Sequence, residues 1–348
     1  MEHLAIDIGG SKCQICVRTA DGQVVEERRW PTEELEVYLA RRPPSRVILE
    51  TCAEAFRIAD LAKRQGHEVR VVSSLLARAL GVGARQTKTD QRDARALSEV
   101  STKVDLVSVH IPSQATRELK ALSTARESLV AARTQLINSL RGWQRTQGKP
   151  VRAATAESLV KKLKRIQEQL PEYIVAQLQV IETLNDNIAT TDRLVRAAAK
   201  NNDVTRRMMT VPGVGPVTAV RFYAALDQVQ RFQGAHKVQA YLGLTPGEYS
   251  SSQRQRRTGI TKAGPPAVRR ALVQAAWSCR LAQGSRSHPL VSWALQIEQR
   301  RGKFVATVAL ARKLAGILYA IWRDGTTYCA ERAAQPTVAS TEEALSMV

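Results

Sequence analysis

Two runs of apolar residues at seven-residue spacing constrain the fold of this chain more than any other feature. The members of the two runs are Leu122, Leu129, Leu136 and Trp143, and then Ile174, Ile181, Ile188 and Val195. Such spacing places apolar side chains along one face of a helix and predicts two long helices, with a break near residues 148–150. We expect an antiparallel coiled-coil arm over residues 111–202, with an ordinary pair of bundle helices as the alternative.

The segment before this arm has a different pattern, in which short β-branched runs alternate with turn signals. The runs cover residues 4–8, 13–18, 24–27, 47–51 and 69–72, and helical patterns cover 53–66 and 90–99. A strand and its hairpin partner, followed by strands that helices separate, predict an α/β domain with a mixed sheet over residues 1–110.

The segment after the arm is mostly helical in pattern. It predicts a third domain over residues 203–330, and the Ala, Thr, Ser and Glu composition of 331–348 predicts a flexible tail. The fold class expected for the whole chain is therefore α/β plus α.

The net charge of the chain indicates which class of partner it binds. Lys and Arg number 52 against 32 Asp and Glu, which gives a formal net charge of +20 and favours a polyanion such as nucleic acid. A membrane protein is not expected, because the start MEHLAIDIGG lacks a basic region followed by an apolar run, and the most apolar late stretch contains Arg312 and Lys313. The sequence predicts a cytoplasmic protein.

Four carboxylates fall where the predicted strands end or a predicted helix begins. Asp7 and Glu50 each end an apolar strand, and Asp90 and Asp93 share one face at the start of the helix over 90–99. Carboxylate oxygens are the ligands that Mg²⁺ prefers, and a pair of such ions supports cleavage of a phosphodiester. The four residues therefore form a candidate metal site for Mg²⁺ or Mn²⁺.

Other interpretations of these acids remain open. Asp90 and Asp93 suit a helix N-terminus without any metal, and Asp7 suits a turn. The run from Asp7 to Lys12 also resembles the first phosphate loop of actin-like sugar kinases, although the chain lacks that family's second glycine-rich loop and its Asp-Gly dipeptide. Of the five scattered cysteines, only Cys13 and Cys16 form a Cys-x-x-Cys pair, and no second ligand pair lies nearby, so reduced thiols are favoured over a zinc site.

A serine-rich segment late in the chain has many cations and no acid. No Asp or Glu occurs from Tyr249 through Ile297, and serines stand at 250, 251 and 252. The basic residues expected to contact nucleic acid here are Arg254, Arg256, Arg257, Lys262, Arg269 and Arg270. A serine hydroxyl among guanidinium groups suits attack on a phosphodiester, and a loop that only binds phosphate is the alternative.

A glycine-rich turn at residues 211–216 precedes that segment. Its sequence, Val-Pro-Gly-Val-Gly-Pro, has the form of a helix-hairpin-helix turn, in which Gly213 and Gly215 let backbone N–H groups approach a DNA phosphate. A tight turn between two packed helices is the alternative.

Taken in order, these motifs resemble one known family over nearly the whole chain. Asp7, Glu50 and the acids of Lys-Thr-Asp-Gln-Arg-Asp-Ala, then Val-Pro-Gly-Val-Gly-Pro, Leu-Gly-Leu-Thr-Pro-Gly-Glu-Tyr-Ser-Ser and Gly-Ile-Thr-Lys-Ala-Gly, are similar to the DEDD transposases of the IS110 insertion-sequence family. The resemblance implies a RuvC-like nuclease domain of the RNase H type, a coiled coil, and a transposase domain with a catalytic serine. It also implies donor and target DNA, a bridge RNA as guide, and a homo-oligomer, expected to be a tetramer.

Carried over to this chain, the resemblance implies a Mg²⁺-binding acidic tetrad of Asp7, Glu50, Asp90 and Asp93. The implied nucleophile is Ser251, with Ser250 as the second choice, because Ser252 stands where the family often has glycine. The expected function is a recombinase that cuts and rejoins DNA through a covalent phosphoserine. Alternatives from other classes are a metal-dependent, structure-selective endonuclease and a nucleic-acid-binding scaffold.

Overall fold

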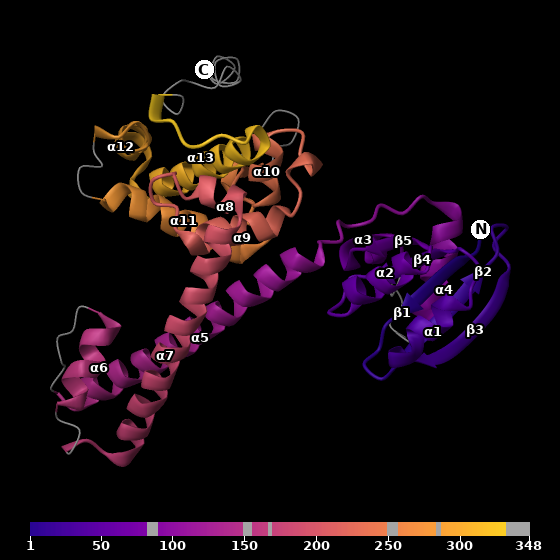
Figure 1. The fold of residues 1–348 in the computed structure, drawn as a ribbon, viewed down its shortest axis with the longest axis horizontal. Helices are drawn as coiled ribbons and strands as arrows, with labels where there is room; N and C mark the ends of the chain where they lie inside the picture. Colours follow the sequence, from indigo (N-terminus) through magenta and orange to yellow (C-terminus); the bar gives the residue numbers. More distant parts are fainter. Residues whose placement is uncertain (82–89, 149–154, 166–168, 249–256, 283–286, 332–348) are drawn as a thin grey trace. The chain divides into compact units, whose positions relative to one another are not determined.

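The computed structural model describes residues 1–81, 90–148, 155–165, 169–248, 257–282 and 287–331. These residues divide into two compact units at Pro112, and each unit is described by itself (Figure 1). The first unit extends from Met1 to Pro112, and the second begins at Ser113.

A five-stranded mixed sheet forms the centre of the first unit. Its strand order is β3-β2-β1-β4-β5, with β1 antiparallel to β2 and parallel to β4. The strands are β1 (His3–Asp7), β2 (Lys12–Arg18), β3 (Val24–Pro31), β4 (Arg46–Glu50) and β5 (Glu68–Val72). Each of the five predicted strands is therefore present, and so is the predicted hairpin between the first two.

Helices cover both faces of this sheet. The helices of the first unit are η1 (Thr32–Glu34), α1 (Leu35–Ala40), α2 (Ala55–Arg64), α3 (Ser74–Ala79) and α4 (Asp90–Lys103). On one face, Leu4 and Ile6 pack with residues of α1 and α2, whereas on the other face Ala5 and Ile48 pack with Leu97 of α4. The alternation of side chains along each strand produces these two apolar layers.

The two cysteines of the Cys-x-x-Cys motif lie on opposite faces of this sheet. The Cys13 thiol donates to the backbone oxygen of Trp30, while the Cys16 thiol accepts from Ser98 on α4. Both thiols are reduced and buried, and burial raises the pKa of Cys13 to about 11. An odd spacing along a strand separates the two thiols, so they do not share a metal ion.

Two long helices form the arm of the second unit, α5 (Gln114–Thr146) and α7 (Glu172–Asn201). They are antiparallel, because the Arg126 guanidinium pairs with Asp192 while Arg133 donates to Asn185. A short helix that the sequence did not predict, α6 (Ala156–Lys164), packs on them through Leu159. Coiled-coil geometry for this pair remains a prediction.

The buried stripe on α5 differs from the predicted one. Leu122, Leu129, Leu136 and Trp143 are only partly buried, whereas the fully buried residues of this helix are Thr116, Ser123, Ile137, Leu140 and Gln144. The stripe therefore lies about one residue later than the leucine spacing predicts, and Leu122, Leu136 and Trp143 pack at its border. On α7, the four residues of the predicted run are all buried.

A helical bundle follows the arm within the same unit. Its elements are α8 (Asp203–Met208), α9 (Pro216–Leu226), η3 (Val229–Arg231), α10 (Ala235–Tyr241), α11 (Pro266–Leu281), α12 (Pro289–Arg301) and α13 (Lys303–Asp324), with a two-stranded sheet of β6 (Pro246–Glu248) and β7 (Arg257–Ile260).

The central helix of the bundle is α13. Among the residues that the structure describes, it is also the one helix that is long and apolar enough to cross a membrane. Its apolar side chains, including Leu310, Leu314 and Leu318, are buried in the core that the other bundle helices share. Its composition therefore reflects packing within the bundle.

Candidate active site

Asp7 and Glu50 end two adjacent parallel strands. The last register pair of β1 and β4 joins Ile6 to Leu49, and Asp7 and Glu50 are the next residues on the two strands. Residues side by side in register point to the same face, and this face is the one on which α4 packs. The predicted meeting of two carboxylates at one sheet edge agrees with this register.

The beginning of α4 points toward the same edge. Near the other end of α4, the Ser101 hydroxyl lies 2.8 Å from Nδ1 of His3, which starts β1. The start of α4, with Asp90 and Asp93, is therefore directed toward the end of β1 that carries Asp7. Asp93 is buried, with 5% of its surface exposed. Asp90 begins the helix, and its side chain lies outside the described residues.

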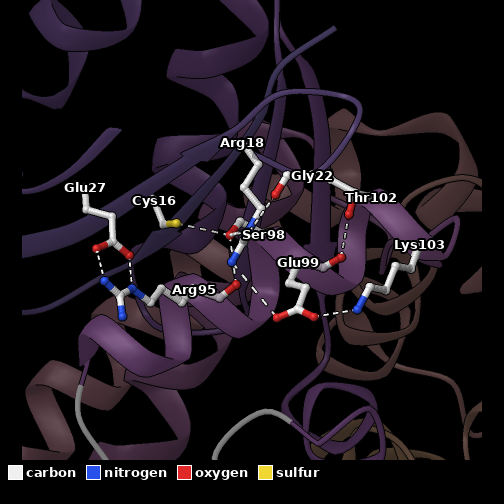
Figure 2. Close-up of polar contacts among 9 residues, drawn as sticks. All are labelled: Cys16, Arg18, Gly22, Glu27, Arg95, Ser98, Glu99, Thr102 and Lys103. Atoms are coloured by element: carbon white, nitrogen blue, oxygen red, sulfur yellow. Dashed lines mark hydrogen bonds and ion pairs between the residues drawn. The ribbon is translucent and has the colours of Figure 1, made fainter. Parts of the chain in front are cut away.

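Polar contacts attach α4 to β2 and β3 (Figure 2). Arg95 pairs with Glu27 through two of its nitrogens, and the amide of Gln91 donates to the same carboxylate at 3.3 Å. One turn farther along, Nε of Arg18 donates to the Ser98 hydroxyl at 3.0 Å. The Arg95 guanidinium holds the pKa of Glu27 below its usual value, because it stabilises the ionised carboxylate.

Sequence reasoning did not find Glu27 and Arg95. Glu27 stands in the charged run Glu-Glu-Arg-Arg, in which nothing distinguishes one acid from the next. The contact joins residues 68 positions apart, and only the packing of α4 on the sheet brings them together.

The donor chemistry at this edge suits a hard divalent cation. Asp7, Glu50 and Asp93 all offer carboxylate oxygens from elements that meet there. Among the described residues, however, no three Asp, Glu, His or Cys side chains come close enough to hold one ion. A closed metal site is therefore a proposal, and it depends on Asp90 as well.

The serine segment lies between two paired strands of the second unit. β6 and β7 are antiparallel, with Glu248 opposite Arg257. The predicted nucleophiles Ser250 and Ser251, together with Arg254 and Arg256, fall at 249–256 and lie outside the described residues, as does the side chain of Arg257. Glu248 and Arg257, which flank the segment, are therefore neighbours across the two strands.

Close backbone contacts hold the base of this hairpin. Gly243 has a φ of +67°, and a Cβ there would lie 2.1 Å from the backbone oxygen of Ala263. Gly264, with a φ of +71°, would place a Cβ 1.9 Å from the backbone oxygen of Tyr241. The glycines of Leu-Gly-Leu-Thr-Pro-Gly and Lys-Ala-Gly thus allow these two motifs to pack against each other.

Two of the predicted nucleic-acid contacts have partners inside the protein. Arg269 donates to the backbone oxygens of Leu242 at 3.0 Å and Ala263 at 2.9 Å, so it stabilises the hairpin base. Arg270 pairs with Glu127 on α5. The local sequence around Arg270 contains no acid and could not predict this pair, because Glu127 belongs to the arm. Lys262 is exposed and adopts a positive φ of 56°.

The glycine-rich turn joins α8 to α9, and its two glycines differ. A Cβ on Gly213, whose φ is +82°, would lie 2.3 Å from the backbone oxygen of Ala275 on α11. Packing between helices therefore requires Gly213. Gly215 is the N-cap of α9, where a Cβ would meet open space, so packing does not explain it. Contact of Gly215 with a DNA phosphate remains a prediction.

Comparison with known proteins identifies the class and the family. Residues 205–291 match a model described as the transposase IS116/IS110/IS902 family, and residues 4–143 match a transposase model of the DEDD IS110 type. The chain is a DNA transposase. It belongs to the IS110 family of DEDD transposases, as the order of its motifs predicts.

Curated relatives extend this similarity along the chain. The chain is 26% identical to the transposase for insertion sequence element IS1328 of Yersinia enterocolitica, over 93% of this chain and 98% of that protein. It is 25% identical to the transposase for IS1111A of Coxiella burnetii, over 93% and 90%. A probable family 20 transposase of Pseudomonas aeruginosa is 26% identical over 94% and 98%. Membership of this family excludes the sugar-kinase interpretation of residues 7–12. The structure explains Gly9 in that run by a tight turn, in which a Cβ would collide with the backbone oxygen of Lys12.

Proposed function

We propose that this transposase cuts and rejoins DNA strands at an insertion sequence, with a Mg²⁺-dependent acidic site and a covalent phosphoserine on Ser251. The observation that carries the proposal is the position of Asp7 and Glu50. They follow the last paired residues of two adjacent parallel strands, on the face where α4 packs. The motif order and the family of the chain support the serine step.

In this proposal, Asp7, Glu50, Asp90 and Asp93 would hold Mg²⁺ or Mn²⁺. The bound ions would stabilise negative charge on the scissile phosphate. The contacts of Arg95 and Gln91 with Glu27 would fix α4, so that Asp93 stays directed toward the edge that Asp7 and Glu50 form.

Ser251 would act as the nucleophile, with Ser250 as the second choice. Its hydroxyl releases its proton as Oγ forms a bond to phosphorus, the bond from phosphorus to the 3′ oxygen breaks, and that oxygen takes up a proton and leaves as a 3′-hydroxyl. The product is a 5′-phosphoserine, which conserves the phosphoester for rejoining. Arg254, Arg256, Arg257 and Lys262 would stabilise the negative charge on the five-coordinate phosphorus.

The finer features of the family complete the proposal. They are a RuvC-like fold for residues 1–110, a coiled-coil arm over 111–202, a transposase domain over 203–330 and a tetrameric assembly. A bridge RNA would select donor and target DNA by base pairing, so the protein would contact mainly backbone and duplex shape. We expect it to act in the bacterial cytoplasm, on the nucleoid.

A second candidate is a metal-dependent, structure-selective endonuclease without a serine intermediate. The division of the chain into two units supports this candidate, because the acidic edge belongs to one compact unit and the serine segment to the other. An acidic site can hydrolyse a phosphodiester with water alone, while the hairpin only binds phosphate.

An adduct assay distinguishes the two candidates. The purified protein is incubated with Mg²⁺, the RNA of its element, and labelled donor and target DNA, and a denaturing gel then shows any protein–DNA adduct. We expect an adduct for the wild type and none for Ser251→Ala or Asp7→Ala. Ser250→Ala is the matched variant, and it is expected to keep the adduct. Cleavage without an adduct that survives Ser251→Ala would favour the endonuclease.

A further inference from the structure

An exposed apolar patch lies where the end of α11 meets the start of α13. Leu281 on α11 is 74% exposed, and Phe304 and Val305 on α13 are 79% and 51% exposed. Half-buried Trp277 connects the two helices, since its ring centroid lies 6.3 Å from that of Phe304 at an interplanar angle of 78°. This edge-to-face contact leaves most of the Phe304 ring open.

The fold does not require these side chains for its core. A single residue, Gly302 with a φ of +82°, joins α12 to α13, and the buried side chains of α13 begin only at Ala306. Every residue from Gln299 to Val305 is exposed. Exposed apolar side chains that gather on one surface often mark a binding site, so the patch is a candidate binding surface.

Cations surround the patch. Exposed Arg300, Arg301 and Lys303 form its rim. Arg280 is nearby, but its side chain is buried and paired with Glu298, so it does not belong to the rim. Lys303 Nζ lies 5.1 Å from the centroid of the Trp277 ring, and the Arg280 guanidinium lies 5.4 Å from it. A symmetric contact with a second copy would bring these cations together, and their repulsion disfavours it.

We propose that this patch, formed by Trp277, Leu281, Phe304 and Val305 with its rim of cations, is a stacking platform for unpaired bases of a nucleic-acid strand. Only unpaired bases expose a face that an aromatic ring can cover, and the phosphates on either side of such a base suit a cationic rim. The platform needs neither metal nor the serine, so it goes beyond the proposed recombination chemistry.

Binding of a short fluorescein-labelled oligothymidine, measured by anisotropy in EDTA, tests the platform. We expect Phe304→Ala to weaken binding about tenfold, since base stacking on an aromatic side chain contributes on that scale. Phe304→Trp should retain binding. Tyr173→Ala, at a 61% exposed aromatic residue on α7, is the matched control and should bind as the wild type does.

Further binding measurements identify the kind of strand that is bound. The same oligonucleotide as RNA distinguishes a guide RNA from a separated DNA strand, and either preference is consistent with the platform. A fully paired duplex should show little effect of Phe304→Ala. An equal loss for duplex and single strand, or no loss for any single strand, would overturn the proposal.

Two further measurements separate the platform from a protein interface. Stacking next to Trp277 should quench its fluorescence, and Trp277→Phe should remove that part of the quench. Sedimentation velocity reports the assembly of each variant. If Phe304→Ala changes the assembly but leaves oligonucleotide affinity intact, the patch is a contact between copies and the proposal is wrong. Because EDTA excludes cleavage, failure here leaves the recombinase proposal unaffected.

Discussion

The guanidinium of Arg95 on α4 donates to both carboxylate oxygens of Glu27 on β3 (Figure 2). Gln91, one helical turn earlier, donates to the same carboxylate, so two positions on one face of α4 are attached to the sheet. Asp93 lies between them in sequence and is buried. The Glu27 contact therefore restricts rotation of α4 about its axis, and with it the direction of Asp93.

Glu27→Gln should weaken metal binding at the acidic edge. The neutral amide keeps the size of the side chain but loses the charge that holds Arg95, so the start of α4 gains freedom. Groups that orient metal ligands typically contribute 10- to 100-fold to affinity, and we expect about a tenfold increase in the Mg²⁺ concentration for half-maximal cleavage. Direct Mn²⁺ binding by calorimetry should weaken in parallel.

Glu99→Gln is the matched control on the same helix. Glu99 lies near the other end of α4, where it contacts Lys103 and Arg18. Its loss removes a surface ion pair of similar kind without releasing the start of the helix, so metal binding should stay unchanged. If both variants weaken metal binding equally, the loss comes from general destabilisation of α4, and the proposed positioning role of Glu27 is wrong.

The Glu27 contact should also depend on pH. Arg95 lowers the pKa of Glu27 in the folded protein, so the unfolded chain binds this proton at a higher pH than the folded protein does. The resulting stability is fully present above the ordinary pKa of glutamate and is lost as the pH falls through the lowered folded value. The wild type should therefore have a higher urea midpoint than Glu27→Gln at pH 7, and the difference should shrink near pH 3. A constant difference would exclude ionisation of Glu27 as its cause.

The parts of the fold that the sequence predicted have a strong local pattern. β1 and β4 are continuous apolar runs, buried on both faces, that end in Asp7 and Glu50, so a common edge for these two carboxylates could be predicted without any structure. The run at Ile181 and Val195 on α7 is buried as its spacing indicates. Short helices such as α3 and α6 were missed, because so few turns give little periodic signal.

What the sequence could not predict depends on partners that are distant in the chain. Arg269 belongs to a basic, acid-free segment, yet it binds the backbone oxygens of Leu242 and Ala263. On α5, the leucine spacing predicts one stripe, whereas the fully buried residues include Ser123, Ile137 and Gln144, each one position later. Contacts between residues distant in the chain decide which residues are buried, and they leave no mark on local sequence patterns.

Glu127→Gln should destabilise the junction of the arm and the bundle. Glu127 on α5 pairs with Arg221 of α9 at 2.9 Å and with Arg270 of α11. The Arg221 side chain is 9% exposed, and burial lowers its pKa, so loss of Glu127 leaves a buried cation without its counter-ion. Breaking a buried pair costs about 3–5 kcal/mol, and partial exposure of Glu127 reduces our expectation to about 2 kcal/mol in urea unfolding.

A second substitution tests the cause of that loss. If the unpaired charge of Arg221 is responsible, Arg221→Met in the Glu127→Gln background should restore much of the stability, because it removes the buried cation. Arg270→Gln should have little effect, since this side chain is 62% exposed. No recovery in the double variant would mean that Glu127 acts through packing instead of charge.

The two glycines between α8 and α9 should respond differently to substitution by alanine. Gly213→Ala places a Cβ 2.3 Å from the backbone oxygen of Ala275 and also requires a positive φ, so we expect a loss of more than about 2 kcal/mol in urea unfolding. Gly215→Ala meets open space at a helix N-cap and should cost at most about 1 kcal/mol. If Gly215 approaches a DNA phosphate, Gly215→Ala should instead weaken binding of duplex DNA, measured by anisotropy at fixed salt. Unchanged DNA affinity in this stable variant would show that the turn joins two helices without contacting the duplex through Gly215.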